Sequence, residues 1–304
     1  MKVSAPGNVI LLGEYAVLEE GGLGVAFAVD KRVRLEVEPA RSLSVHGIWP
    51  GGSFEWTPGC EEGNPIVSAA YEAVRSKCEV PAQRIQVDSS ELYSRDGRKA
   101  GFGSSAAVTV ALISAFRASG RLDRTTPRLA LRAHRLAQGG TGSGYDVLCS
   151  YYGGWGLFQG GVKPSWEPHD PLVRIRVHLF PGPRPVSTQN AIQSFLQWKE
   201  KRTTAAARFI EESNSNAKAF LEAKSAREAE AAFRRARDTG IMIGDEIGVQ
   251  ARMPVPPGVD PELCKALGAG NELGIYLQVP GAPEPPPDSG LIHEQVSYGI
   301  SWQP

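Results

Sequence analysis

Two glycines one residue apart, two serines and a long apolar run stand together in the middle of the chain. Residues 99–107 read Lys-Ala-Gly-Phe-Gly-Ser-Ser-Ala-Ala, and an apolar run from Val108 to Phe116 follows. Glycine lets the backbone approach a ligand with no Cβ in the way, and a serine can cap the free N–H groups of a helix start. Such a start also presents the positive end of the helix dipole, which favours an anion such as phosphate. The pattern therefore predicts that residues 99–107 form a phosphate-binding loop, called the phosphate loop below, and that a buried helix follows. An ordinary N-capped turn is the alternative.

The residues of this loop suit a phosphate in complementary ways. Lys99 supplies a mobile positive charge, and the hydroxyls of Ser104 and Ser105 can bind a phosphate oxygen or a phosphate-bound Mg²⁺. The spacing differs from that of the P-loop, which has a longer interval between its glycines and a Lys directly before Ser or Thr. The residues expected at the phosphate are Gly101, Gly103, Ser104, Ser105 and Ala106.

Composition excludes several other classes of protein. Lys+Arg and Asp+Glu both number 33, so bulk charge indicates neither a nucleic-acid nor a membrane-surface partner. The four cysteines, at positions 60, 78, 149 and 264, lack the spacing of a metal site or a disulfide framework. With no apolar signal segment and no membrane-spanning run, the chain is expected to be cytoplasmic.

The order of periodic and punctuated segments indicates two domains. Residues 3–12 predict a strand interrupted by a turn at Pro6-Gly7-Asn8. Residues 32–38 alternate apolar and charged side chains, as a half-exposed strand does. Residues 190–239 are rich in Ala, Glu, Lys and Arg and predict two or three helices, broken at the Ser-Asn-Ser-Asn run 213–216. Between these parts, residues 164–171 have the composition of a linker. A length of 304 residues suits two domains that meet near residue 165.

Two further glycine-rich segments carry candidate site residues. The segment 139–146 holds Gly at four positions and ends in Ser143-Gly144-Tyr145-Asp146. The segment Gly268-Ala269-Gly270 precedes an apolar strand. A second glycine loop that ends in an acid about forty residues after the first is difficult to explain by packing, although Asp146 could also be a helix N-cap.

Three motifs in this order resemble those of the GHMP kinases, which phosphorylate galactose, homoserine, mevalonate and phosphomevalonate. The first runs from Ala5-Pro6-Gly7-Asn8 to Gly13-Glu14-Tyr15-Ala16-Val17-Leu18, the second is the phosphate loop, and the third is Gly268-Ala269-Gly270. Within that superfamily the chain is most similar to the bacterial phosphomevalonate kinase branch, through Tyr15, Lys99 and the Ser187-Thr188 pair. The resemblance implies an α+β fold with an N-terminal ATP-binding domain (1–165) like the second domain of ribosomal protein S5. A ferredoxin-like C-terminal domain (166–304) would follow.

The resemblance also implies roles for particular residues. Asp146 and Lys99 would be catalytic, and ATP would bind at the phosphate loop with Mg²⁺ near Ser104 and Ser105. The acceptor would be bound by Lys265 and by residues of the first motif, the third motif and the second glycine loop: Asn8, Glu14, Ser143, Gly144, Lys265, Gly268, Ala269 and Gly270.

Departures from the family's usual motifs affect these roles. Asn8 stands where mevalonate-type kinases carry Lys, Gly140 where mevalonate kinases carry a Mg²⁺-binding Glu, and Asn271 where a further Gly is usual. The first two count against mevalonate kinase itself.

The expected reaction is phosphoryl transfer from ATP to phosphomevalonate, with mevalonate or another small alcohol as the alternative acceptor. A non-catalytic sensor is the alternative outside enzymes, and the oligomeric state stays open. For Glu14 the alternative is an ion pair with a surface base, and for Lys265 a solvated surface position.

Overall fold

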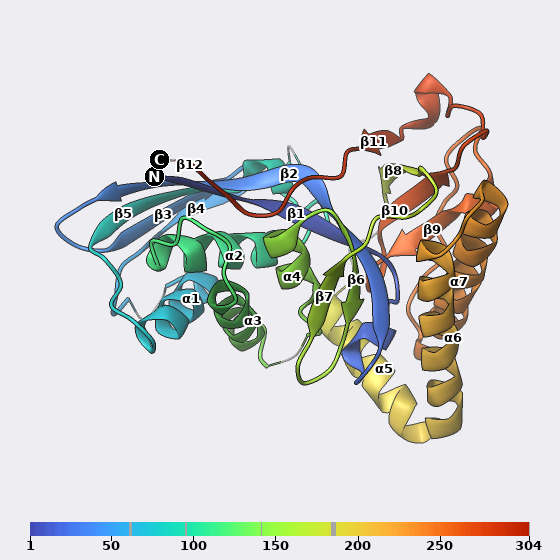
Figure 1. Ribbon diagram of the computed structural model, residues 1–304, viewed down its shortest axis with the longest axis horizontal. Coiled ribbons are helices and arrows are strands. Elements are labelled where there is room, and N and C mark those ends of the chain that lie inside the picture. Colours follow the sequence, from blue (N-terminus) through green and yellow to red (C-terminus); the bar gives the residue numbers. More distant parts are fainter. Residues whose placement is uncertain (61–62, 95, 141, 184–186, 304) are drawn as a thin grey trace. The chain divides into compact units, whose positions relative to one another are not determined.

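The computed structural model describes residues 1–60, 63–94, 96–140, 142–183 and 187–303 (Figure 1). The chain packs into two compact units, each made of separate sequence segments. The first unit comprises residues 1–9, 28–154 and 296–304, and the second comprises residues 10–27 and 155–295. The predicted boundary near residue 165, between an N-terminal and a C-terminal domain, stays a prediction. The mixed α+β class is confirmed.

The first unit contains a sheet in the order β12-β1-β2-β5-β3-β4. Its β3–β5 pair is parallel, and its β1–β12, β2–β5 and β3–β4 pairs are antiparallel. The long strands β1 and β2 also continue into the second unit. The strands are β1 (Lys2–Leu12), β2 (Leu23–Pro39), β3 (Ser44–Trp49), β4 (Gly52–Trp56), β5 (Gln83–Asp88) and β12 (Ser301–Gln303).

Four helices cover one face of this sheet (Figure 1). They are α1 (Pro65–Arg75), α2 (Ser104–Phe116), α3 (Thr125–Ala137) and α4 (Tyr145–Tyr152). Helix α2 packs against the other three, and nearly all its side chains are buried. This burial confirms the prediction that a buried apolar helix follows the phosphate loop. Because the loop leads directly into α2, it lies at the edge of the core.

The first strand corrects the prediction of a turn at Pro6-Gly7-Asn8. β1 runs unbroken through these residues. The Asn8 N–H donates to the Phe102 carbonyl at 3.0 Å, so the phosphate loop lies against the strand there. A Cβ at Gly7 would lie 2.7 Å from the same carbonyl oxygen. The glycine therefore serves close approach of two backbones rather than a turn.

The end of the chain returns to the first unit and is tied there by Arg32. This guanidinium is buried and donates to Ser4, to Ser297 Oγ and to the carbonyls of Tyr298 and Gly299. Burial lowers the pKa of Arg32. Five hydrogen bonds satisfy the buried charge, which would otherwise be costly.

Asp123 fixes the start of α3 and makes the first unit sensitive to acid. Its carboxylate accepts from the N–H groups of Thr125 at 2.6 Å and Thr126 at 2.7 Å, and from Arg117 at 2.7 Å. Burial raises its pKa, but these donors more than offset that effect and lower the pKa to about 2, below its usual 3.8.

We expect Asp123 to contribute about 2 kcal/mol to stability near neutral pH, by the linkage of a lowered carboxyl pKa to folding. The folded state binds fewer protons than the unfolded state between pH 3.8 and about 2. The contribution is therefore present above that window and is lost as the pH falls through it. Urea unfolding of the parent and Asp123→Asn at about pH 6 and about pH 3 measures this, and the gap between the two proteins should narrow at the lower pH. An unchanged gap would contradict the assignment.

The second unit combines a short sheet extension, a separate four-stranded sheet and three helices. β6 (Trp155–Gln159) pairs with residues 23–27 of β2 and with β7 (Ser165–Pro168). The separate sheet is antiparallel in the order β11-β8-β10-β9. Its strands are β8 (Arg176–Pro181), β9 (Cys264–Leu267), β10 (Gly270–Gln278) and β11 (Ile292–Glu294), and the helices are α5 (Thr188–Lys201), α6 (Thr203–Leu221) and α7 (Ala226–Ile247).

Two predictions for this unit need correction. The expected linker 164–171 contains β7, whose residues pair with β6. The run 213–216 lies inside α6 instead of breaking it. Its polar side chains have partners there: Asn214 Oδ1 accepts from the Leu23 N–H at 2.7 Å, and Asn216 donates to Thr239 at 3.2 Å. Tertiary contacts thus override the local preference of Asn and Ser for turns.

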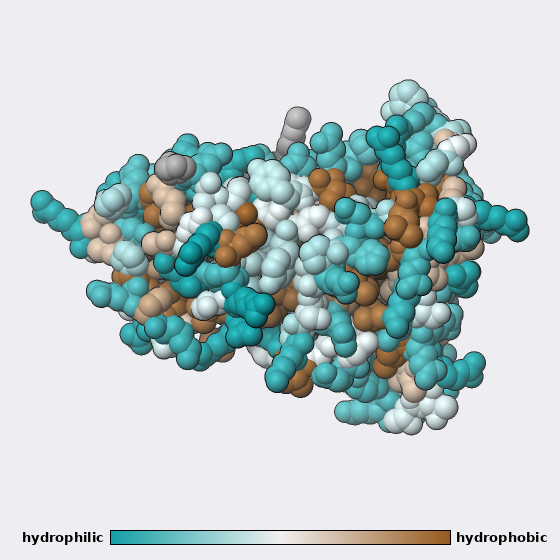
Figure 2. All heavy atoms as spheres, in the orientation of Figure 1, coloured by the Kyte–Doolittle hydropathy of each residue, from teal (hydrophilic) through white to brown (hydrophobic). Residues whose placement is uncertain are grey.

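The surface is mainly hydrophilic on the face drawn in Figure 2, where hydrophobic side chains form smaller groups between hydrophilic ones. In the described part of the chain, no helix has the length and apolar character needed to cross a membrane.

Candidate functional site

The phosphate loop of the first unit leads into α2 through two glycines whose left-handed backbone conformation disfavours residues with a Cβ. Gly101 has φ 80° and Gly103 has φ 61°, and Gly103 is the N-cap of α2. No side chain caps the helix, so the predicted serine cap is wrong. Among the described residues, nothing accepts a hydrogen bond from the N–H groups of Ser104 and Ser105. These two donors are available to an anion.

Asn8 supports this loop from β1. The residue is 1% exposed, and its Nδ2 donates to Ser150 Oγ at 3.0 Å, which in turn donates to the Pro6 carbonyl at 2.8 Å. A Cβ at Gly103 would lie 2.4 Å from Asn8 Nδ2. In the described part of the chain, Asn8 Oδ1 is buried without a hydrogen-bond partner. An unpaired buried acceptor is costly, which marks this position as one that suits a donor or a cation.

Lys99 and its neighbour Arg98 are exposed but differ in their contacts. Arg98 pairs with Asp96 at 2.7 Å, whereas the Lys99 backbone bridges to Tyr93 and its side chain extends from the surface. No described residue forms an ion pair with the Lys99 ammonium. Its charge is therefore available to a ligand.

Asp146 lies in the first turn of α4, behind the second glycine loop. Gly144, with φ 89°, is the N-cap, and the Arg135 side chain donates to the Ser143 carbonyl at 3.0 Å. Asp146 Oδ1 accepts from the Val147 N–H at 2.9 Å, and the side chain is 20% exposed. The alternative that Asp146 is the N-cap is wrong, because Gly144 occupies that position. The carboxylate keeps one oxygen oriented and part of its surface open.

His134, which the sequence analysis did not select, joins these elements. It is 3% exposed, and its Nε2 lies 3.1 Å from Ser105 Oγ and 3.7 Å from Asp146 Oδ2. The Gln138 amide nitrogen lies 3.0 Å from the same atom. Only Gln138, one helical turn away, is a local neighbour; Ser105 and Asp146 come from other helices, so no local spacing indicates the cluster.

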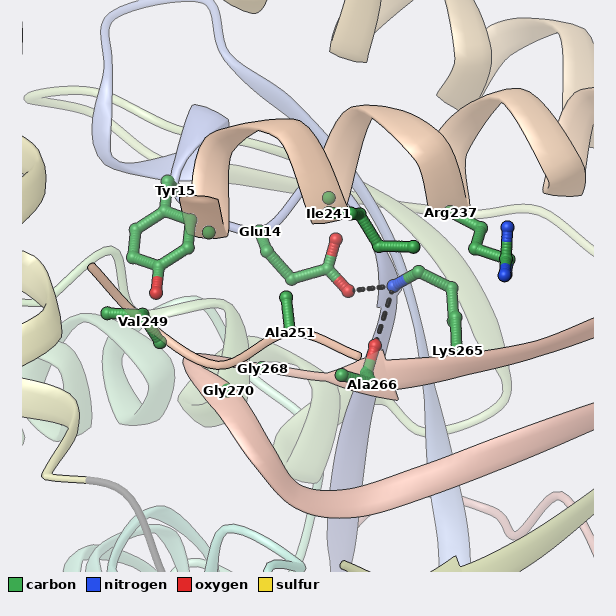
Figure 3. A pocket seen from close by; sticks show the side chains of 12 residues that line it. Glu14, Tyr15, Arg237, Ile241, Val249, Ala251, Lys265, Ala266, Gly268 and Gly270 are labelled. Atoms are coloured by element: carbon green, nitrogen blue, oxygen red, sulfur yellow. Dashed lines mark hydrogen bonds and ion pairs between the residues drawn. The ribbon is translucent and has the colours of Figure 1, made fainter. Parts of the chain in front are cut away.

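The second unit places Glu14 beside Lys265. Lys265 is 4% exposed, and its Nζ donates to Glu14 Oε1 and, at 2.9 Å, to the Ala266 carbonyl (Figure 3). It also donates to the Leu11 carbonyl at 2.9 Å. Burial raises the pKa of Glu14, and the charge of Lys265 opposes that effect. Both surface alternatives are therefore wrong: the lysine is buried, and the base that pairs with Glu14 is buried as well. All three ammonium hydrogens of Lys265 have acceptors.

A small cavity adjoins this ion pair. It measures about 20 Å³, and Figure 3 shows Glu14, Lys265 and the backbone at Gly268 and Gly270 around it. The Tyr15 hydroxyl donates to the Ala269 carbonyl at 2.9 Å and so fastens the third glycine loop. Such a volume holds about one water molecule. This cavity is a structural feature of the second unit and is too small for a nucleotide.

Each unit thus holds its own group of predicted residues. Contacts in the first unit join Asn8 to Gly103 and, through His134, Ser105 to Asp146. Contacts in the second unit join Glu14 to Lys265 and place Ala269 on Tyr15. Among the described residues, no group of three or more His, Cys, Asp or Glu side chains could hold a metal ion. A cation at the first-unit site would depend on hydroxyl, amide and ligand oxygens.

Comparisons with known proteins find several similar sequences. The sequence model for the GHMP kinases N terminal domain matches residues 65–154. A phosphomevalonate kinase of Saccharolobus solfataricus is 32% identical over 161 residues, 50% of this chain and 47% of that protein. One of Streptomyces sp. is 27% identical over 304 residues, 81% of this chain and 79% of that protein. A mevalonate kinase of Methanothermobacter thermautotrophicus is 34% identical over 166 residues, 50% of this chain and 48% of that protein.

Solved structures show the same fold over nearly the whole chain. The phosphomevalonate kinase of Streptococcus pneumoniae, in complex with phosphomevalonate and AMPPNP, has a TM-score of 0.73 at 17% identity, covering 98% of this chain and 100% of that chain. The match to the Saccharolobus protein spans about half of that relative's length. The family match at residues 65–154 covers α1 to α4 and includes the phosphate loop and Asp146. Residues 65–154 of this chain match the GHMP kinases N terminal domain, and the chain has the α+β fold of the Streptococcus pneumoniae phosphomevalonate kinase.

Proposed function

We propose that this protein is an ATP-dependent kinase that converts 5-phosphomevalonate to 5-diphosphomevalonate. The observation that carries the proposal is the start of α2, where two N–H groups without partners among the described residues follow two left-handed glycines. The carboxylate of Asp146 lies near the Ser105 hydroxyl through their shared contact, His134. The phosphomevalonate kinases among its relatives support this choice of acceptor.

The first-unit residues fit a nucleotide phosphate and its cation. The Ser104 and Ser105 N–H groups would donate to phosphate oxygens, and the Ser104 and Ser105 hydroxyls would supply further donors or an oxygen ligand. When bound, Mg²⁺ would neutralise charge on the transferring phosphoryl group. The unpaired Asn8 Oδ1 adds a hard oxygen acceptor on β1 close to Gly103.

The acceptor determines what the protein must supply. In the proposed transfer, an acceptor phosphate oxygen forms a bond to the γ-phosphorus, and the bond from that phosphorus to the bridging oxygen breaks with its electron pair left on ADP. A phosphate monoester has a second pKa of about 6 and is mainly dianionic at pH 7, so no base has to remove a proton. Two anions must instead be brought together, which increases the need for cations.

Lys99 is the exposed cation that we assign to this task. The ammonium of Lys265 is occupied inside the second unit, so we propose that it supports the backbone at Ala266 and the loop 268–270 that follows. The alternatives are mevalonate or another small alcohol as acceptor, and a sensor without turnover. A cytoplasmic location stays a prediction, with which the free thiols of the four cysteines are consistent.

Turnover of phosphomevalonate and of mevalonate by the purified protein, with ATP and Mg²⁺, tests the function. We expect faster turnover of phosphomevalonate. Faster turnover of mevalonate would favour the alcohol kinase. Nucleotide binding without turnover of any small acceptor in a panel would favour the sensor.

Lys99→Ala is expected to lower kcat by about 10²-fold, the effect of losing a transition-state charge contact of about 3 kcal/mol. Stability should change little because the side chain is exposed. Steady-state kinetics and thermal unfolding measure the two effects, and Lys77→Ala, an exposed lysine of the same unit, is the control. An activity loss that only follows a fall in Tm would make Lys99 a structural residue.

A further inference from the structure

His134 connects the phosphate loop to the acidic residue of α4. The side chain enters from α3, which packs against both α2 and α4. One nitrogen, Nε2, faces Ser105 Oγ at 3.1 Å, Gln138 Nε2 at 3.0 Å and Asp146 Oδ2 at 3.7 Å. Packing alone does not require a buried polar ring whose nitrogen meets residues of two candidate functional segments.

The partners of Nε2 determine where the ring carries its hydrogen. An imidazole nitrogen offers either one hydrogen or one lone pair. Gln138 presents its amide nitrogen, which only donates, so Nε2 accepts and the neutral ring carries its hydrogen on Nδ1. In the Ser105–His134 hydrogen bond the hydroxyl is then the donor and shares the Nε2 lone pair with Gln138. The Gln138 amide nitrogen also donates to Ser105 Oγ, at 3.5 Å.

This orientation decides between the two roles open to Ser105. A hydroxyl that donated to phosphate would point its hydrogen at the ligand. With its hydrogen on His134, the Ser105 oxygen instead presents its lone pairs, which suit a hard divalent cation.

We propose that His134 is a positioning residue that orients Ser105 Oγ as an oxygen ligand for the cation bound with a nucleotide phosphate. This inference rests on the proposed kinase function. Asp146 Oδ2 lies 3.7 Å from the same nitrogen, but an unprotonated Nε2 offers the carboxylate no hydrogen, so the ring orients Ser105 alone.

Calorimetric binding of a non-hydrolysable ATP analogue, with and without Mg²⁺, tests the inference without turnover. His134→Leu removes the accepting nitrogen, whereas the side-chain oxygen of His134→Gln can occupy the position of Nε2. We expect Mg²⁺ to tighten binding to the parent, and His134→Leu to lose about tenfold of that gain, the value of one hydrogen bond of about 1.4 kcal/mol. His134→Gln should restore most of the gain. His46→Leu, an exposed histidine of β3, should behave as the parent does.

The outcomes separate this inference from the proposed function. A parent protein that binds no nucleotide would overturn both. A parent that binds with a Mg²⁺ gain which His134→Leu fully retains would overturn only the role of His134. Nitrogen NMR of the histidine-labelled parent gives a test independent of whether the variants fold. An Nε2 signal of an unprotonated nitrogen in the parent is expected, and a hydrogen on Nε2 would overturn the proposal.

Discussion

Asp146→Asn is expected to lower kcat for phosphomevalonate by about 10²-fold without moving the acidic limb of the pH profile. Because the proposed acceptor is already a dianion, we propose that Asp146 orients a cation and does not remove a proton. Loss of that orientation should cost about 3 kcal/mol of transition-state stabilisation. The acidic limb should stay near the second pKa of the acceptor phosphate, about 6. The substitution keeps the oxygen that accepts from the Val147 N–H, so α4 should still begin at the same residue.

Kinetics across pH 5 to 9 with both acceptors provide the measurement. Asp88→Asn is the matched control, because Asp88 is an exposed aspartate of the same unit whose Oδ1 accepts from the Ser90 N–H. A general base for an alcohol would behave differently: the loss could reach about 10⁴-fold, and the limb that belongs to its carboxylate would disappear. That result, together with faster turnover of mevalonate, would replace the proposed acceptor with an alcohol.

Local patterns predicted the elements whose causes are local. The apolar run 108–116 predicted α2 because every side of that helix is buried, and the alternation over 32–38 predicted part of β2. The turn expected at Pro6-Gly7-Asn8 failed for the opposite reason: Phe102, far along the chain, lies against the strand there. Composition alone does not show whether a glycine serves a turn or a close approach.

The site shows the same division between local and distant causes. Motif order indicated the phosphate loop, Asp146 and the third glycine loop. It did not indicate His134, because Ser105 and Asp146 reach that ring from separate helices. The environment of Lys265 was equally hidden, since Leu11 and Glu14 are about 250 residues away in the sequence.

Lys265→Met is expected to be strongly destabilising, by about 3–5 kcal/mol, because it leaves the buried Glu14 carboxylate without its partner. The side chain is 3% exposed and Glu14 is 10% exposed, so water cannot replace the lost ammonium. Adding Glu14→Gln should recover much of the loss, since no buried charge is then left unpaired. Urea unfolding measures these differences. Lys218→Met, an exposed lysine of α6, is the control and should be near neutral.

The pH dependence of Lys265→Met tests the cause of that loss. Burial already raises the pKa of Glu14, and removing Lys265 takes away the charge that opposes this rise. In the variant, folded Glu14 should therefore bind a proton at a pH where the unfolded chain has released it. When the folded state binds more protons, the free energy of unfolding falls as the pH rises through that window. The gap between parent and Lys265→Met should accordingly be smaller near pH 5 than near pH 8. A gap of the same size at both values would show that the lysine acts through packing of its stem and not through its charge.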